Sequence, residues 1–435
     1  MKQNIPQNEK LFPKDFLWGA STASHQVEGG TYNQWTVWEL QHARALASTS
    51  KHRLGWIPDW PRFEPEASNP ENYISGVGIR HYEHYEQDFK LLKQLNLNAF
   101  RFGVEWSRVE PEEGAWNVEA IAHYKVYIET LLKQGIVPVL NLWHWTMPVW
   151  FSEKGGFEKR SNIRYFERFV ERMCKELPIK KLHYIITLNE PNVYSSFGYI
   201  TGEWPPNKKN MLTFIRVYNH LAVAHRRAYK ILKQHKKSLQ VGVAAQLANI
   251  QPKRPHNWLD LLATKWMRYF WNWWFLNRIK RYQDYVGFNY YFTDYYAFGD
   301  YKGKKRMSLF QRENPNVPKN DLGWYMEPEG IYPLMVRVYA HYKKPILITE
   351  NGLADATDTY RRWWIEETIV AMERALSEGI PLKGYFHWSL LDNFEWAYGW
   401  WPRFGLVAVD RSTMKRTIRE SGKYYARKID EVTQK

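Results

Sequence analysis

Short apolar runs alternate along the chain with longer stretches whose apolar residues recur every three or four positions. The short runs are rich in β-branched and aromatic residues and end in polar ones, which is typical of buried strands, whereas the longer stretches predict helices. The predicted strands end near Trp18, Arg101, His144, Asn189, Gln246, Tyr290, Glu350 and Trp388. The clearest predicted helices cover residues 81–95, 119–134, 162–176, 213–234 and 363–378. Eight strands alternating with helices predict an α/β fold in which a parallel sheet closes into a barrel, rather than two domains.

The spacing of the predicted strands indicates long connecting loops. Trp18 and Trp388 lie 370 residues apart with seven strand intervals between them. Each interval is therefore about 53 residues, more than a strand, a helix and two short turns need. We expect residues 1–435 to form a single domain, with residues 1–10 as a flexible N-terminus.

Two of the predicted strands each end in a glutamate. The run 185–188 is followed by Asn189-Glu190-Pro191, and the run 346–349 is followed by Glu350. The carboxyl ends of barrel strands carry the functional residues, and a carboxylate at the end of a buried strand is costly unless it is paired, hydrogen-bonded or used in chemistry. Two carboxyls facing one cavity can divide the acid and nucleophile roles of glycoside hydrolysis. Structural ion pairs at Glu190 and Glu350 are the alternative that these residues alone leave open.

Aromatic residues are unusually frequent, with 23 Trp, 29 Tyr and 21 Phe making up 17% of the 435 residues. Such rings suit sugars, nucleic-acid bases and membrane interfaces alike. The net charge of +16 keeps nucleic acids and anionic membranes among the candidate partners. However, the basic runs 233–237 and 302–306 are typical of solvated helix and loop ends, and no nucleic-acid-binding module is recognisable. We therefore expect no nucleic-acid partner.

Other features of the composition bear on the cellular location. Hydrophobic residues at 44% and charged residues at 24% are typical of a soluble globular protein. No apolar run approaches the roughly 18 residues of a membrane span, and residues 1–14 lack the apolar core of a signal peptide. The single cysteine, Cys174, cannot form an internal disulfide, which fits a reducing compartment. These features predict a cytoplasmic protein.

Longer motifs surround the two glutamates. Residues 187–191 read Thr-Leu-Asn-Glu-Pro and residues 348–352 read Ile-Thr-Glu-Asn-Gly, with further motifs at 12–29, 100–108, 287–291 and 387–396. In this order, over residues 12–425, they resemble glycoside hydrolase family 1, the β-glucosidase family. One departure is His25, which stands where many members of the family have Tyr.

The resemblance implies a (β/α)8 TIM barrel that performs a retaining double displacement without a metal or other cofactor. By family position, Glu350 is the nucleophile and Glu190 is the acid/base residue. Arg101 and the Tyr291 hydroxyl would stabilise the nucleophile, and Asn189 would hold the sugar 2-hydroxyl.

The resemblance also implies a set of substrate-binding residues around this pair. They are Gln26, His144, Trp145, Asn289, Trp324, Trp388, Glu395 and Trp396. Trp388 would stack beneath the sugar, and Trp324 would lie on the leaving-group side. Glu395 argues against a 6-phosphorylated sugar, because a carboxylate would repel a phosphate. We expect a small β-glycoside or short oligosaccharide with a terminal β-glucosyl residue, with β-galactosyl and β-fucosyl residues as further candidates.

One aromatic segment, residues 258–282, is not explained by sugar binding. Its first helical stripe consists of Leu259, Leu262, Trp266, Tyr269, Phe270 and Trp273, and Arg268, Arg278, Lys280 and Arg281 surround it. Burial against the barrel is one hypothesis, and contact with an anionic membrane or a protein partner is the other. The second hypothesis leads to a rival function, in which a catalytically weak barrel docks on carbohydrate or membrane through this helix.

Overall fold

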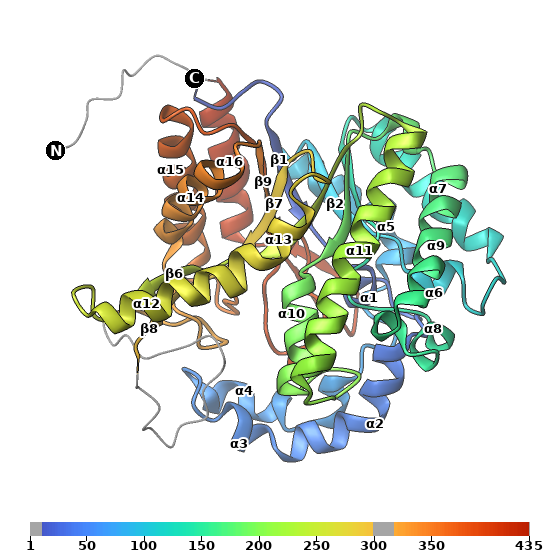
Figure 1. Cartoon of the computed structure of the whole chain (residues 1–435), viewed down its shortest axis with the longest axis horizontal. Helices are drawn as coiled ribbons and strands as arrows, with labels where there is room; N and C mark the ends of the chain where they lie inside the picture. The colour runs from blue at the N-terminus through green and yellow to red at the C-terminus, as the bar shows by residue number, and fades with distance from the viewer. Residues whose placement is uncertain (1–10, 299–316, 435) are drawn as a thin grey trace.

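The computed structural model describes residues 11–298 and 317–434 (Figure 1). The predicted flexible N-terminus, residues 1–10, and the basic run 302–306 lie outside the described residues.

Eight strands pair in parallel and close into a barrel, in the order β1-β10-β9-β7-β5-β4-β3-β2. They are β1 (Leu17–Ser21), β2 (Ala99–Gly103), β3 (Val137–Asn141), β4 (Tyr184–Asn189), β5 (Gln240–Gln246), β7 (Val286–Tyr290), β9 (Ile346–Asn351) and β10 (Leu382–Trp388). The predicted TIM barrel is confirmed. Two strand ends differ from the prediction, since β1 continues past Trp18 to Ser21, and β3 ends at Asn141 rather than His144. Trp145 has a φ of 71°, a left-handed conformation that a strand does not accommodate.

Helices surround the strands (Figure 1). They are α5 (His81–Gln94), α7 (Val118–Lys133), α9 (Ile163–Glu176), α11 (Met211–His235), α13 (Trp274–Ile279), α14 (Ile331–Tyr342), α15 (Arg361–Ser377) and α16 (Glu420–Gln434). All five predicted helices agree with these bounds to within two residues at each end.

The barrel interior is filled by one apolar side chain from each strand or its start. These are Leu17, Ala99, Val139, Ile186, Ala244, Tyr285, Leu347 and Phe386. Because side chains alternate faces along a strand, Arg101 points to the same side of β2 as Ala99, two residues nearer the carboxyl end. A fully buried guanidinium therefore lies in the barrel just beyond its apolar layer.

The connections add further elements. They are α1 (Ser24–Val27), α2 (Gln34–Ser48), α3 (Ser50–Leu54), α4 (Trp60–Ala67), α6 (Trp106–Val109), α8 (Val149–Glu153), α10 (Pro191–Ser196) and α12 (Trp258–Met267). A short parallel pair joins β6 (Asn249–Pro252) to β8 (Thr293–Tyr296), and an antiparallel pair joins β11 (Val407–Val409) to β12 (Arg416–Ile418). None of the helices in the described part of the chain is long and apolar enough to cross a membrane.

The aromatic segment forms two α-helices rather than one. A π-helical turn over residues 268–273 separates α12 from α13. Burial against the barrel is confirmed only for the second half, where Trp271, Phe275 and Leu276 are buried, whereas Trp258, Trp266 and Tyr269 are exposed. The sequence pattern assumes a constant 3.6 residues per turn and therefore predicts one continuous face. The π turn rotates the side chains of the second half relative to those of the first, so the two halves present different faces to the barrel.

Candidate active site

Glu190 lies between the end of β4 and the start of α10, with only 4% of its surface exposed. Asn289 donates a hydrogen bond of 2.7 Å to its carboxyl oxygen Oε1. Burial raises the pKa of Glu190 well above its ordinary value, and the negative charge of Glu350 raises it further. A carboxyl in this environment can hold a proton at neutral pH.

Glu350, near the end of β9, has stronger donors than Glu190. Arg101 forms a buried ion pair with one carboxylate oxygen, and the Tyr291 hydroxyl donates to the other at 2.6 Å. Burial and the charge of Glu350 raise the pKa of Tyr291 well above its usual range, so its hydroxyl stays protonated and donates. Glu350 thus has a cationic donor at one carboxyl oxygen and a neutral hydroxyl donor at the other.

Irregular strand pairing changes the direction of the side chains near the two glutamates. The register slips between Ile186 and Asn189 where β4 pairs with β5. It slips again where β7 pairs with β9, so that Asn289 lies opposite Glu350. Such bulges interrupt the strict alternation of side-chain directions and are common beside active sites. Because a side chain at Gly352 would collide with the Trp388 carbonyl, glycine there lets the end of β9 approach β10 closely.

Asn189 connects the glutamates to His144. Its side-chain oxygen accepts from Arg101 at 2.7 Å, and its side-chain nitrogen lies 2.9 Å from Nε2 of His144. Burial lowers the pKa of His144 well below its usual range, with a further contribution from the charge of Arg101, so the imidazole is neutral. A neutral ring can exchange hydrogen bonds with uncharged hydroxyl groups.

Gln26 and Glu395 supply polar groups on another side of the site. The Gln26 amide donates to Asn393 at 2.9 Å and lies 3.3 Å from a carboxyl oxygen of Glu395. Its buried Oε1 makes no hydrogen bond within the described part of the chain. Burial raises the pKa of Glu395 to about 8, and the charge of Glu350 contributes to that increase.

The remaining predicted residues are aromatic and lie on the same end of the barrel. Trp388 and Trp396 have ring centroids 5.8 Å and 5.9 Å from that of His144, and the Trp145 indole nitrogen donates to the Asn189 carbonyl at 3.0 Å. Trp324 lies 5.6 Å from the Tyr291 ring. Hydrogen bonds, an ion pair and ring contacts thus connect eleven of the thirteen predicted residues, and Gln26 and Glu395 form a separate hydrogen-bonded pair.

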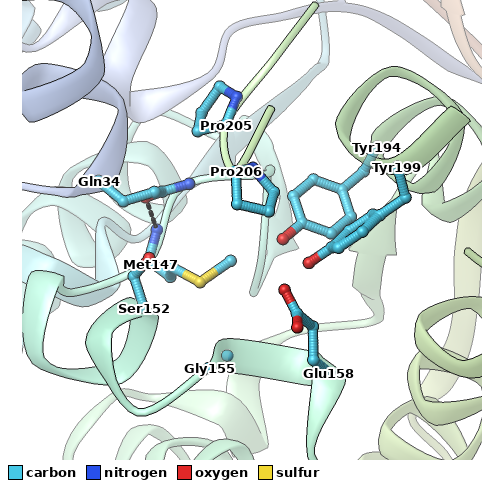
Figure 2. Close-up of a pocket in the computed structure, with 10 residues that line it drawn as sticks. Gln34, Met147, Ser152, Gly155, Glu158, Tyr194, Tyr199, Pro205 and Pro206 are labelled. Carbon is cyan, nitrogen blue, oxygen red and sulfur yellow. Dashed lines mark hydrogen bonds between the residues drawn. The ribbon is translucent and has the colours of Figure 1, made fainter. Parts of the chain in front are cut away.

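A buried amide fixes the loop that follows β3. Gln34 accepts from the Met147 backbone N–H at 2.6 Å and donates to the Trp145 carbonyl at 2.9 Å. Figure 2 shows this amide at the side of a small pocket that Tyr194, Tyr199 and Glu158 also line. These two hydrogen bonds hold the loop in which Trp145 adopts its left-handed conformation.

Sequence reasoning missed several residues that support the site. His25 stacks on Trp396 with ring centroids 5.4 Å apart, and it pairs with the buried Glu39 at 2.7 Å. Trp204 packs on Trp145 at 4.6 Å. Asn393 lies within the motif 387–396, so the sequence offered a signal for it, whereas Glu39, in α2, and Trp204 lie outside every motif.

Within residues 11–298 and 317–434, no group of three His, Cys, Asp or Glu side chains is arranged to hold a metal ion. His81, in the His- and Glu-rich start of α5, instead contacts Asp88 and the Tyr127 hydroxyl, each at 2.8 Å.

Comparison with known proteins decides the family. The model of glycosyl hydrolase family 1 matches residues 8–281 and 276–433. The chain belongs to glycosyl hydrolase family 1. As a member, it is a glycoside hydrolase, and the rival hypothesis of a catalytically weak docking barrel is not favoured.

The relatives of this glycoside hydrolase include β-glucosidases. It is 32% identical to β-glucosidase A of Thermotoga maritima, over 96% of this chain and 98% of the relative, and 31% identical to β-glucosidase A of Acetivibrio thermocellus, over 95% and 97%. Among solved structures, the Thermotoga maritima β-glucosidase in complex with glucoimidazole superposes with a TM-score of 0.84 at 29% identity. That match covers 97% of this chain and 99% of the other.

Proposed function

We propose that this glycoside hydrolase is a retaining exo-β-glycosidase that removes terminal non-reducing β-D-glucosyl residues. One observation carries the proposal. Glu350 accepts from a cation and a phenol, whereas the donor to the Glu190 carboxyl is a neutral amide. This asymmetry suits an ionised nucleophile beside a protonated acid.

In the first step, a carboxylate oxygen of Glu350 attacks the anomeric carbon. The bond from that carbon to the leaving oxygen breaks, its electron pair stays on the oxygen, and the oxygen takes the proton of Glu190. The products are a glycosyl ester on Glu350 and a released alcohol. Once ionised, Glu190 can act as a base.

In the second step, Glu190 takes a proton from a water molecule as the water oxygen attacks the anomeric carbon. The ester bond to Glu350 breaks, its electrons return to the carboxylate, and a sugar of unchanged anomeric configuration leaves. Asn189, which Arg101 orients, is the proposed partner of the sugar 2-hydroxyl.

Uncharged polar groups support an unphosphorylated sugar. Gln26 presents an acceptor without a hydrogen bond in the described structure, and His144 is neutral. Gln26, His144 and Glu395 together offer donors and acceptors for several hydroxyls, while none of the three supplies a fixed positive charge for a phosphate. Trp388 is the proposed stacking surface, and Trp324 extends it toward the leaving group. β-Galactosides and β-fucosides are secondary candidates.

The test uses a panel of nitrophenyl glycosides. Glu350→Ala should lose most turnover and, with azide present, should yield an α-glycosyl azide. Glu190→Ala should lose roughly 10²- to 10⁴-fold of its rate. Glu119→Ala, at an exposed position of α7, is the control and should keep full activity. Full activity of Glu350→Ala, or an inverted first product in an NMR time course, would contradict the proposal.

A cytoplasmic location is also part of the proposal. Its support is the presence of one cysteine, Cys174, among 435 residues, which fits a reducing compartment. Fractionation of the source cells with an activity assay tests it, and activity confined to the extracellular fraction would contradict it.

A further inference from the structure

Helix α12 turns an apolar face outward. The relative exposures are 70% for Trp258, 58% for Leu262, 64% for Trp266 and 53% for Tyr269. Trp258, Leu262 and Trp266 lie in α12, and Tyr269 lies at the start of the π-helical turn that follows it. The four positions are spaced by four, four and three residues, so their side chains share one side of this helical segment. A continuous apolar stripe that solvent reaches is a mark of an interaction surface.

The inward side of α12 is polar, which shows that its orientation is fixed. Asp260 and Thr264 are buried there. Asp260 forms an ion pair of 2.7 Å with Arg254 and accepts a hydrogen bond of 2.8 Å from the Phe298 backbone N–H. Turning the apolar stripe inward would break these contacts and expose Asp260. The buried contacts of Asp260 therefore keep the apolar stripe facing outward.

The next turn anchors this segment to the carboxyl ends of the barrel strands. Trp271 donates to the Gln246 side chain at the end of β5, and Asn272 donates to the Ala248 carbonyl at 3.0 Å. The same region reaches the catalytic end, because Asn192, two residues after Glu190, donates to the Gln246 carbonyl at 2.7 Å. Figure 1 shows α12 projecting beyond the barrel beside β6 and β8. The outward stripe thus lies at the rim of the end that holds the glutamates.

The segment that carries the stripe is strongly basic. Residues 253–281 contain seven Lys and Arg residues and a single acidic residue, the buried Asp260. Lys265 is exposed within the apolar stripe itself. A second copy of the same face would bring like charges together, which disfavours self-association. An anionic surface is attracted instead.

We propose that this face, the α12 stripe of Trp258, Leu262, Trp266 and Tyr269 with Lys265, docks on the surface of an anionic lipid bilayer. Trp and Tyr rings favour the interface between headgroups and acyl chains, and a Lys side chain can extend its ammonium to the headgroups while its methylenes stay among the apolar residues. Anionic lipids attract the surrounding cations in addition. Docked in this way, the protein holds the catalytic end of its barrel next to the membrane.

Flotation of the full chain with vesicles tests the proposal. Vesicles of phosphatidylcholine and phosphatidylglycerol in equal parts should bind the protein at least about tenfold more tightly than phosphatidylcholine alone, and 1 M NaCl should weaken binding. Trp258→Ser with Trp266→Ser should lose at least about tenfold of the affinity, since interfacial binding scales with the buried apolar area. Lys265→Glu should weaken binding to the anionic vesicles only.

The matched control replaces exposed apolar residues elsewhere. Leu40, in α2, and Leu212, in α11, are 65% and 74% exposed, and Leu40→Ser with Leu212→Ser should bind vesicles like the unchanged protein. Both double variants should hydrolyse a soluble nitrophenyl glycoside at the unchanged rate, which shows that they fold. Failure of the unchanged protein to float with anionic vesicles would overturn the proposal, as would equal binding by the two double variants. A dimer that Trp258→Ser with Trp266→Ser converts to a monomer would assign the face to a second copy instead.

Discussion

At the scale of single residues, the charge of Glu350 influences the protonation of Glu190. The charge of Glu350 is the second largest cause, after burial, of the raised pKa of Glu190, and Glu395 contributes less. Glu350→Gln keeps the shape of the side chain and removes that charge, so the pKa of Glu190 should fall. Titration of Glu190 by ¹³C NMR measures the change.

The control for that titration is Glu395→Gln, which replaces the carboxyl with the weaker effect on Glu190 and should lower the pKa of Glu190 by less. If the pKa of Glu190 stays the same or rises in Glu350→Gln, the carboxyls are not coupled in the way that the proposed division of roles requires.

Glu395 predicts a pH dependence of substrate binding. Its pKa is raised to about 8, so the carboxyl is protonated below that pH and can donate a hydrogen bond to a sugar hydroxyl. As the pH rises through about 8 the proton is lost, and KM for a nitrophenyl β-glucoside should rise. Glu395→Gln carries a permanent donor, so its KM should stay flat across the same range. A KM that rises equally in both proteins would show that another group is responsible.

At the scale of loops and secondary-structure elements, Gln34 fixes the loop that carries the proposed binding residue Trp145. Gln34→Ala removes both hydrogen bonds to the loop that carries Trp145. We expect a loss of unfolding free energy of about 1–3 kcal/mol, because buried backbone groups lose their partners, and a KM that rises more than kcat falls. Denaturant titration and steady-state kinetics measure the two effects.

Gln87→Ala, on an exposed position of α5, is the matched control and should change neither quantity. A destabilised Gln34→Ala protein with an unchanged KM would show that the two hydrogen bonds of Gln34 stabilise the fold but do not affect substrate binding.

The secondary-structure elements of the barrel could be predicted from the sequence because their patterns are regular. The apolar runs of β4 and β9 lead into Glu190 and Glu350, and helices such as α7 keep a 3.6-residue period throughout. The outward stripe of α12 could not be predicted in the same way. Its direction depends on Asp260, whose partner Arg254 and the Phe298 N–H are brought to it only by the fold.

The site likewise combines residues that the sequence predicts with contacts that only the fold creates. Its two glutamates and their donors are adjacent to strand ends, so the alternation of strands and helices already groups them. Support from His25 and Glu39 depends on a contact between helices α1 and α2, a hydrogen bond of 2.7 Å between a buried imidazole and a carboxyl, beside the stacking of that imidazole on Trp396. No periodicity in the sequence records such a contact.

At the scale of the whole molecule, closure of the barrel pairs its first strand with its last. The first strand, β1, pairs with both β2 and β10, so strands separated by most of the sequence share hydrogen bonds. Opening the barrel at this seam exposes the apolar interior at once, because each strand contributes to the same layer. We therefore expect the barrel to unfold cooperatively.

The single cysteine offers a direct measurement of that cooperativity. Cys174, in α9, is buried, and burial raises the pKa of its thiol to about 12. A disulfide reagent such as DTNB at pH 8 should therefore react with the native protein roughly 10³-fold or more slowly than with the urea-unfolded chain. With rising urea, the labelling transition should coincide with the loss of near-UV circular dichroism. Cys174→Ala should give no signal, and Ser412→Cys in that background, at an exposed position, should react at once. Labelling that precedes the loss of dichroism would show that α9 detaches before the barrel opens.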